Sequence, residues 1–272
     1  MVNGFNPNSL RQALEIRAAN DVIPYAGGTD LMIGEQHPGS YLFLHAVPEL
    51  KRVYLEDGIL HLGAGCTFTE LLEHPLTPAL LKEALSQIAA PAIRNEGTIG
   101  GNIGNGSAKA DSALIFFVAD ASLKLESSTG TRILPIRDFY IGRKQLALHP
   151  DELITEVLLP LRWLDGYVYQ KVAARKALAI SRISFVGLLT LDNGVIAHCA
   201  TAFGAVSDVV IRRPEIDSML IGKSVEQVKA IRSDYLAAYD KAIVPTRGRV
   251  SSEYRKAVCL NLLLDFLNHY EI

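Results

Sequence analysis

The chain has 272 residues, of which 49% are hydrophobic, and this length is enough for two domains with well-buried cores. Its 27 basic and 29 acidic residues give a net charge of −2, which excludes a nucleic-acid surface as the main function. Because no apolar run approaches the ~18 residues of a membrane span and no signal-peptide pattern opens the chain, we expect a cytoplasmic protein without membrane contact.

The first 30 residues predict a helix, a short strand and a glycine-rich loop, in that order. Asn8 or Ser9 is a suitable cap for a helix that runs to about residue 19, where leucine and alanine recur at helical spacing. The apolar run 22–25 is typical of a short strand, and it leads into the loop Pro24–Asp30. The adjacent glycines of this loop carry no Cβ atoms, so its N–H groups can approach an anionic oxygen.

Residues 41–89 predict strands followed by two helices. The turn at residues 56–58 ends in Asp-Gly and is typical of a hairpin. Thr67 or Thr69 is expected to cap a short helix, and Pro78 to start a longer one that continues to residue 89 with an apolar stripe. The predicted strands are residues 41–44, 52–55 and 59–63.

A second glycine-rich loop, residues 97–107, lies about seventy residues after the first. Both loops end in small hydroxyl or amide side chains, which is typical of two walls around a phosphate-containing ligand such as a dinucleotide. The Rossmann spacing does not fit, because Gly27 and Gly28 are adjacent and no third glycine follows until Gly34. No Gly-Lys-Ser/Thr occurs either, so a P-loop is excluded.

The rest of the chain predicts a mixed segment and then a smaller domain. After a helix over residues 111–118, strands are expected at 123–126, 132–134 and 152–159. From Trp163 the pattern changes to an antiparallel meander and then two helices. We therefore predict two domains, residues 1–163 and 164–272. The elements of the second are strands 167–174, 182–191 and 195–205 and helices 225–242 and 251–268.

The cysteines and histidines predict no metal site. Cys66, Cys199 and Cys259 are too far apart for a Cys-x-x-Cys pair, and we expect all three to be small apolar core residues of a protein in a reducing compartment. The seven histidines are scattered, and His198 lies in an apolar strand-like stretch where a core position is favoured. No catalytic side chain is predicted.

Several motifs together resemble the FAD-binding medium subunit of molybdenum hydroxylases of the xanthine dehydrogenase and carbon monoxide dehydrogenase type. The strongest are Ala26–Asp30, Arg94–Asn102 and Asp111 nine residues later. The resemblance covers nearly the whole chain. Further matches in the same order are Leu134–Phe139, Asp151–Ile154, Lys171 with Arg175–Ala177, and Arg249–Arg255.

This resemblance implies an α+β fold, with a two-subdomain FAD-binding domain (PCMH/VAO-like) followed by a small C-terminal α+β domain with an antiparallel sheet and helices. It implies noncovalent FAD, with the pyrophosphate between the two loops. Asp111 resembles the carboxylate that binds FAD hydroxyls, Lys171 a lysine near the flavin, and Leu153 an apolar contact. The loop contacts implied are Tyr25, Ala26, Gly27, Gly28, Thr29, Asp30, Leu31, Thr98, Ile99, Gly100, Gly101 and Asn102.

Ordinary structural roles compete with these assignments. Asp111 could be only the N-cap of the helix that follows it, and Lys171 only a surface lysine on a strand. Arg175, Lys176, Arg212 and Arg213 are expected to be solvated charges or subunit contacts. Tyr254 and Arg255 are expected to hold the last helix, and Trp163 to pack at the domain junction. Gly104, Gly106 and Lys109 depart from the family pattern, which has Ala or Pro there.

The function implied is electron transfer in a larger, xanthine dehydrogenase-like complex. A molybdopterin-binding large subunit and a small subunit with [2Fe–2S] clusters would be the partners, and NAD or another molecule would accept the electrons. Three alternatives remain open. These are a free-standing FAD-dependent oxidoreductase of the same superfamily, a nucleotide-binding regulator without redox chemistry, and a structural subunit that has lost its flavin.

Overall fold

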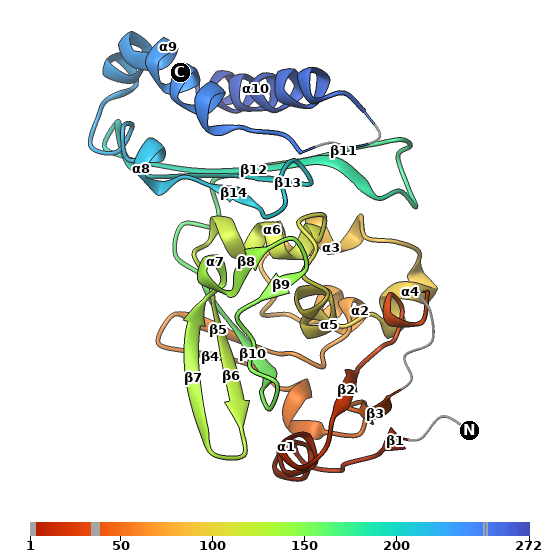
Figure 1. Cartoon of the computed structure of the whole chain (residues 1–272). Helices are drawn as coiled ribbons and strands as arrows, with labels where there is room; N and C mark the ends of the chain where they lie inside the picture. The colour runs from red at the N-terminus through yellow and green to blue at the C-terminus, as the bar shows by residue number, and fades with distance from the viewer. Residues whose placement is uncertain (1–3, 34–38, 247, 249) are drawn as a thin grey trace. The chain divides into compact units, whose positions relative to one another are not determined.

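A computed structural model of the chain, shown in Figure 1, describes residues 4–33, 39–246, 248 and 250–272. The chain divides into two compact units that interleave along the sequence. Unit 1 comprises Met1–Pro78, Ile88–Ser107 and Asp120–Leu161, and unit 2 comprises Ala79–Gln87, Ala108–Ala119 and Arg162–Ile272. The domain boundary between residues 163 and 164 stays a prediction. The division into compact units does not test it, because unit 2 contains two earlier segments, Ala79–Gln87 and Ala108–Ala119, besides the C-terminal one.

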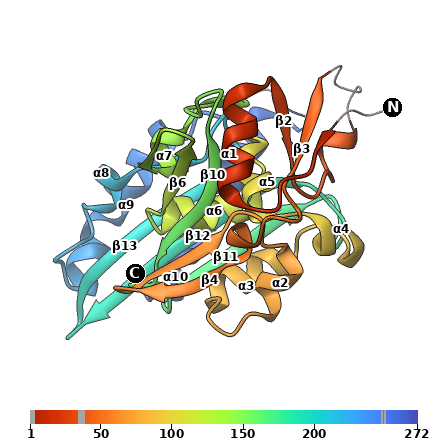
Figure 2. The same ribbon diagram turned by 90° about the horizontal axis from the view of Figure 1, so that it is seen from below.

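Unit 1 begins with a small parallel sheet and one helix. The strands β1 (Gly4–Phe5), β3 (Ser40–Phe43) and β2 (Val22–Tyr25) lie in that order. Helix α1 (Leu10–Ala19) is capped by Ser9, whose side chain accepts a hydrogen bond from the N–H of Gln12, so of the two predicted caps Ser9 is the one used. Figure 2 shows α1 beside these strands, and Leu14, Val22 and Leu42 form part of the core between them.

A five-stranded antiparallel sheet forms the other part of unit 1. Its order is β4 (Val53–Glu56), β5 (Ile59–Gly63), β10 (Leu153–Pro160), β6 (Ser122–Ser127) and β7 (Gly130–Pro135). The predicted hairpin is confirmed, since Asp57 and Gly58 have φ of 49° and 77°, as a two-residue type I′ turn requires. The remaining elements are η1 (Leu31–Ile33), η2 (Pro48–Lys51), α2 (Phe68–Glu73), α4 (Pro91–Glu96), α5 (Ile99–Gly104), α7 (Ile136–Phe139), β8 (Tyr140–Gly142) and β9 (Gln145–Leu146).

Unit 2 is a four-stranded antiparallel sheet with helices on both faces (Figure 1). Its order is β11 (Tyr167–Ala173), β12 (Ser181–Asp192), β13 (Val195–Gly204) and β14 (Ile211–Arg212). This antiparallel sheet confirms the fold predicted for the C-terminal part. Helices α3 (Ala79–Ser86) and α6 (Asp111–Val118) pack on one face, and α10 (Ser252–His269) packs on the other with α9 (Val225–Ala242) and α8 (Pro214–Asp217) nearby.

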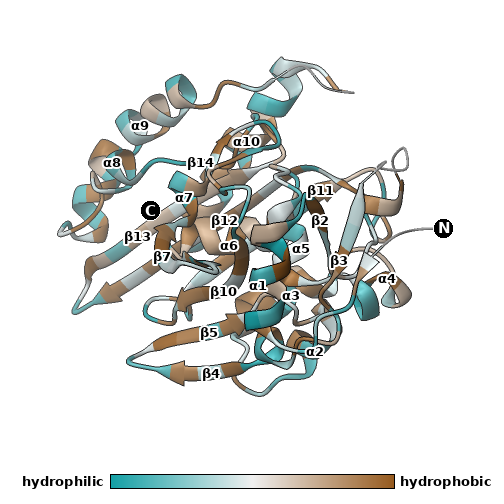
Figure 3. Cartoon of the chain, turned by 60° about the horizontal axis from the view of Figure 1, so that its bottom comes forward, coloured by the Kyte–Doolittle hydropathy of each residue, from teal (hydrophilic) through white to brown (hydrophobic). Residues whose placement is uncertain are grey.

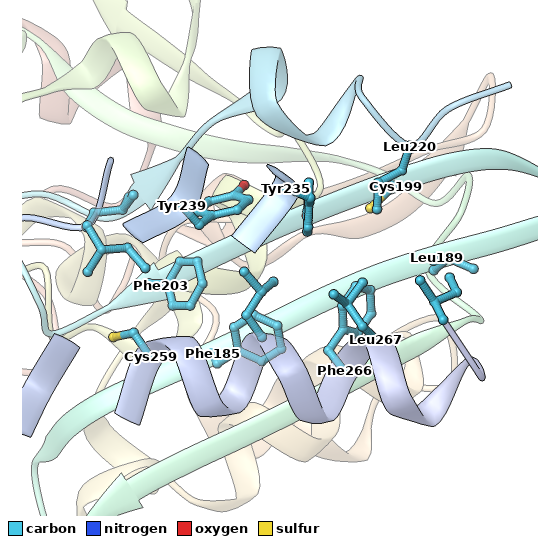
Figure 4. Close-up of a cluster of buried hydrophobic side chains, with 14 of the residues drawn as sticks. Phe185, Leu189, Cys199, Phe203, Leu220, Tyr235, Tyr239, Cys259, Phe266 and Leu267 are labelled. Atoms are coloured by element: carbon cyan, nitrogen blue, oxygen red, sulfur yellow. The ribbon is translucent and has the colours of Figure 1, made fainter. Parts of the chain in front are cut away.

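Aromatic side chains fill the core of unit 2 beneath α9 and α10. Figure 4 shows Phe185, Phe203 and Phe266 in one cluster with Tyr235 and Tyr239, and all five are fully buried. The rings of Phe185 and Phe203 are 5.1 Å apart, and those of Phe185 and Phe266 are 5.8 Å apart. Burial of each such side chain contributes roughly 1.5–3 kcal/mol to folding.

A buried carboxylate ties α8, α9, β13 and β14 together within unit 2. Oδ1 of Asp217 accepts from Thr201 Oγ1 at 2.9 Å and from the hydroxyls of Tyr235 and Tyr239 at 2.8 Å each. Its Oδ2 accepts from the Thr201 N–H at 2.9 Å and from the Arg212 guanidinium. Asp217 is 1% exposed, and burial raises its pKa despite the opposing effect of Arg212. The expectation that Arg212 is solvated is therefore wrong.

Hydropathy follows burial in the described elements. All eight residues of α6 are buried, and Figure 3 shows α9 alternating between hydrophilic and hydrophobic residues, as expected for a helix with one covered face. Across the described ranges we find no helix that combines the length and the apolar character needed to cross a bilayer.

Candidate functional site

The two glycine-rich segments meet within unit 1. The first follows β2 directly, and the second follows α4, which ends at Glu96. A Cβ atom added at Gly27 would lie 1.8 Å from the carbonyl oxygen of Glu96 and 3.0 Å from the N atom of Gly97. The two backbones are therefore in direct contact at a position where only glycine fits.

The first segment, Pro24–Asp30, contains backbone N–H groups that donate no hydrogen bond to a described residue. Gly28 has φ of +66°, and a Cβ there would lie 2.1 Å from the Tyr25 hydroxyl. Within residues that the structure describes, the N–H groups of Gly27, Gly28 and Thr29 have no hydrogen-bond acceptor. These residues are only half-buried. Such a turn of consecutive N–H groups is suited to an anion, so this part of the chain fits a pyrophosphate.

Aromatic rings of β2 and β3 pack together at the point where the first segment begins. The Tyr25 ring lies 5.7 Å from that of Tyr41 and 5.0 Å from that of Phe43, and Tyr41 is buried. Leu31, the last residue predicted to contact the cofactor from this loop, is half-buried and begins η1. The rings fix the end of β2 and thereby the direction in which the loop leaves the sheet.

The second segment is a short helix rather than the predicted loop. Thr98 caps α5, and its Oγ1 accepts from the Gly101 N–H at 3.1 Å. The N–H groups of Ile99 and Gly100 donate to the carbonyls of Cys66 and Ala64 at 3.0 and 2.8 Å, and that of Asn102 donates to Thr98 O at 3.0 Å. These backbone donors are thus already used within the protein. A Cβ at Gly100 would lie 2.6 Å from the Cβ of Ala64, which explains this glycine.

Gly101 differs from Gly100 in facing outward. It is exposed, and among the described residues an added Cβ would lie close to Thr98 Oγ1 alone, at 2.9 Å. Gly104, on the same helix, is also exposed, and its added Cβ would make an ordinary contact with Ile154 at 3.7 Å. A side chain at Gly101 would therefore occupy the space beside α5, where a ligand held by the first segment could lie.

Leu153 lies in the core of unit 1. It is 2% exposed and packs with Leu14, Val22 and Leu42. Its position supports the small sheet that carries the first segment. The predicted contact between Leu153 and a cofactor stays a prediction, since so little of the side chain reaches the surface of the unit.

Asp111 and Lys171 form a buried ion pair within unit 2. Lys171 Nζ donates to Asp111 Oδ2 at 2.8 Å and to the Gln87 carbonyl at 2.8 Å, while Ser181 Oγ donates to Asp111 Oδ1 at 2.6 Å. The side chains of Lys171 and Asp111 are 8% and 5% exposed. The alternative that Lys171 is a surface lysine is wrong. So is the alternative that Asp111 is an N-cap, because Ala110 occupies that position.

Tyr169 lies two residues from Lys171 on β11. It is 5% exposed, and its hydroxyl has no hydrogen-bond partner among the described residues. Burial, and then the carboxylates of Asp111 and Glu83, raise the pKa of Tyr169 above its ordinary value. The phenol therefore stays protonated beside the ion pair at neutral pH.

The other residues that the sequence singles out have structural roles. Trp163 stacks on His198, with ring centroids 5.5 Å apart, and its expected place at a domain junction stays a prediction. His198 is half-buried on β13, so the expectation that it is a core residue is wrong. Arg255 donates to the carbonyls of Ala205, Val206 and Thr246 and holds α10 as predicted, whereas Tyr254 is 47% exposed. Arg249 lies outside the described residues.

The three cysteines are core residues, as expected from the sequence. All are free and buried, and burial raises the pKa of Cys66 to about 11 and that of Cys259 to about 12. Thiols with such pKa values are unreactive at neutral pH.

Comparison with known proteins gives matches along the whole chain. A family model described as the FAD binding domain in molybdopterin dehydrogenase matches residues 1–162, and one described as the CO dehydrogenase flavoprotein C-terminal domain matches residues 168–270. The xanthine dehydrogenase FAD-binding subunit of Escherichia coli O157:H7 is 38% identical, over 75% of this chain and 74% of that protein. The nicotinate dehydrogenase FAD-subunit of Eubacterium barkeri is 31% identical, over 98% and 96%.

Solved structures agree with these matches. A chain of the reconstituted CO dehydrogenase from Oligotropha carboxidovorans superposes with a TM-score of 0.89 at 25% identity, covering 97% of this chain and 95% of that one.

Proposed function

Because the chain belongs to the family of FAD-binding medium subunits of molybdenum hydroxylases, we propose that it transfers electrons between an iron–sulfur partner subunit and an external acceptor in a xanthine dehydrogenase-like complex. The FAD would supply one- or two-electron chemistry when bound, so this chain needs to hold and shield it rather than provide a catalytic side chain. We place molybdopterin and the [2Fe–2S] clusters on partner subunits in the cytoplasm, with NAD as one possible acceptor.

The observation that carries this proposal is the contact between the two glycine segments in unit 1. The N–H groups of Gly27, Gly28 and Thr29, which donate to no described residue, would bind the pyrophosphate, and Ala26, Asp30 and Leu31 would continue that wall. The opposite wall would be α5, with the Thr98 hydroxyl and the exposed face at Gly101. The remaining members of the proposed FAD-binding set are Tyr25, Ile99, Gly100 and Asn102 in unit 1.

We assign the metal centres to partner subunits because the described part of this chain contains no ligand set for them. The described residues contain no group of three His, Cys, Asp or Glu side chains that could hold a metal ion. The three cysteines of the sequence are separate and buried, whereas [2Fe–2S] clusters are held by four clustered ligands.

The purified chain is expected to carry flavin absorbance that dithionite bleaches, and to be unable to oxidise xanthine. Adding the molybdopterin and iron–sulfur subunits should restore xanthine turnover, and all three should co-purify. The measurement is a visible spectrum together with an activity assay on each preparation. Xanthine turnover by the single chain, with no metal found by elemental analysis, would contradict the proposal.

For Asp111 we propose a direct contact with FAD hydroxyls in addition to its ion pair. A carboxylate has about four acceptor sites, and Lys171 and Ser181 use two of them. Asp111→Ala should therefore weaken FAD binding by roughly 1–3 kcal/mol and also destabilise the fold, because Lys171 loses its partner. Both the FAD dissociation constant and the melting temperature should be measured.

Ser181→Ala is the matched control for Asp111→Ala. It removes the 2.6 Å hydrogen bond to Asp111 but leaves the carboxylate in place. We expect a lower melting temperature with unchanged FAD affinity. If both variants lose FAD only in proportion to their loss of stability, Asp111 has a structural role and no contact with the cofactor.

A further inference from the structure

A cavity of about 400 Å³ lies within unit 1, between α1, η2 and the strands β4, β6 and β10 of the five-stranded sheet. This volume falls within the roughly 300–1,000 Å³ that is typical of small-molecule sites. None of the residues that line the cavity belongs to the set proposed above for FAD. The cavity is therefore a candidate site for a second ligand.

The walls of this cavity carry more negative than positive charge. Three carboxylates line it, those of Glu49, Glu126 and Glu156, and they face two cations, Arg52 and Lys124. A concave surface with an excess of one sign of charge attracts a ligand of the opposite sign. The lining residues therefore favour a cation.

Lys124 holds two of these carboxylates in place. Its Nζ lies 3.0 Å from Glu126 Oε1 and donates to Glu156 Oε1 at 3.2 Å. The hydroxyl of Thr155, a residue that is 1% exposed, donates to Glu126 Oε1 at 2.8 Å. Burial acts to raise the pKa of Glu156, but hydrogen bonds from His61 and Lys124 outweigh burial and lower that pKa. This part of the wall therefore keeps ionised carboxylates in fixed positions.

Glu49 is the lining carboxylate that takes no part in this network. It belongs to η2 and is half-buried. Among the described residues Glu49 has no ion pair, and its Oε2 is buried without a hydrogen-bond partner. A buried acceptor without a donor costs free energy, and the cost is greater for a charged group. A ligand that donates hydrogen bonds to Glu49 would remove this cost.

The other walls of the cavity favour an organic cation over a metal ion. The described residues contain no group of three His, Cys, Asp or Glu side chains that could hold a metal ion. Leu10 and the Tyr54 ring also line the cavity, and their apolar surface suits the carbon atoms of a ligand. An ammonium group has three N–H donors and a guanidinium has five, so either can bond more than one carboxylate oxygen.

We propose that this cavity binds a small organic cation whose primary ammonium or guanidinium group pairs with Glu49. The proposal goes beyond electron transfer and does not depend on FAD binding, because the two sets of residues do not overlap.

Agmatine, which has a guanidinium group at one end and an ammonium group at the other, is the probe. It is titrated by calorimetry into the full chain, with tetramethylammonium, a cation without N–H donors, as the reference at equal ionic strength. Glu49→Gln should weaken agmatine binding about tenfold, or about 1.4 kcal/mol, because it removes the charge but keeps the size of the side chain. The flavin content of each sample is measured in parallel and should not change.

Glu73→Gln is the matched control for Glu49→Gln. Glu73 is an exposed residue of α2 in the same unit, and it does not line the cavity. Its agmatine affinity should equal that of the unmodified chain. Equal weakening in both variants, or agmatine binding no tighter than that of tetramethylammonium, would overturn the proposal.

Arg52→Gln tests the charge of the cavity in the opposite direction. Arg52 is exposed, and its side chain has no ion pair with a described residue, so the substitution should not disturb the fold. Removing this positive charge should tighten agmatine binding about threefold, a size expected for charges at a partly exposed site. Weaker agmatine binding in Arg52→Gln would contradict the recognition of a cation.

Discussion

Asp217→Asn is expected to lower the free energy of unfolding by about 3–5 kcal/mol, the usual cost of breaking one side of a buried ion pair. In the native chain, both carboxylate oxygens of Asp217 accept hydrogen bonds, from Thr201, Tyr235, Tyr239 and Arg212. An asparagine would turn an NH₂ group towards one set of these donors and remove the negative charge that Arg212 contacts at this position. Urea denaturation followed by fluorescence measures the loss.

Asp234→Asn is the control for that experiment. Asp234 is an exposed residue of α9, the helix that also carries Tyr235 and Tyr239. Surface substitutions of this kind usually change stability by about 0.5 kcal/mol or less. A loss below about 1 kcal/mol in Asp217→Asn would show that the polar cluster contributes little and that α9 is held by its apolar contacts.

Gly27→Val should yield a protein without bound flavin. The added Cβ would lie 1.8 Å from a backbone oxygen of Glu96, so the two glycine segments could not keep their contact. Forced overpacking of this kind costs typically 1–3 kcal/mol locally, and the N–H groups of Gly27, Gly28 and Thr29 would move with the loop. The ratio of flavin absorbance to protein absorbance after purification is the measurement.

Two further glycine variants distinguish a loss of FAD binding from a loss of protein stability. Gly101→Val adds a side chain at an exposed position of α5, where its Cβ would displace only the Thr98 hydroxyl, 2.9 Å away, so it should weaken FAD binding with a much smaller loss of melting temperature than Gly27→Val. Gly104→Ala lies on the same helix, where alanine is favoured over glycine by about 1 kcal/mol, and it should retain full flavin. Full flavin occupancy in both Gly27→Val and Gly101→Val would exclude the proposed pyrophosphate position.

The sequence predicted the elements whose signals are local. The cap at Ser9 and the apolar periodicity after it placed α1, and Asp57-Gly58 placed the turn between β4 and β5. The motif resemblance named the family that the comparisons then confirmed. The short helices α4 and α5 were missed, α4 because its six residues are too few for a periodic pattern and α5 because its glycines oppose helix formation, a preference that the hydrogen bonds from Ile99 and Gly100 to the carbonyls of Cys66 and Ala64 override.

Features that join distant residues could not be predicted in the same way. No local pattern shows that Thr201, Arg212, Asp217 and Tyr239 share one hydrogen-bonded cluster. The same is true of Asp111 and Lys171, whose pairing depends on how α6 packs on β11 and β12. For these two residues the sequence offered only a resemblance, and their ordinary alternatives were wrong because it contains no signal of burial.

The interleaved units also determine the order in which a growing chain can become compact. Helix α6 is buried on all sides, yet the strands that cover it belong to a segment that begins only at Arg162. During synthesis from the N-terminus, its apolar residues are made well before β11, β12 and β13. Until those strands leave the ribosome, α6 has no completed sheet on which to pack. The nascent chain therefore passes through a stage that invites chaperone binding, and a fragment ending near residue 160 would retain that exposed helix permanently.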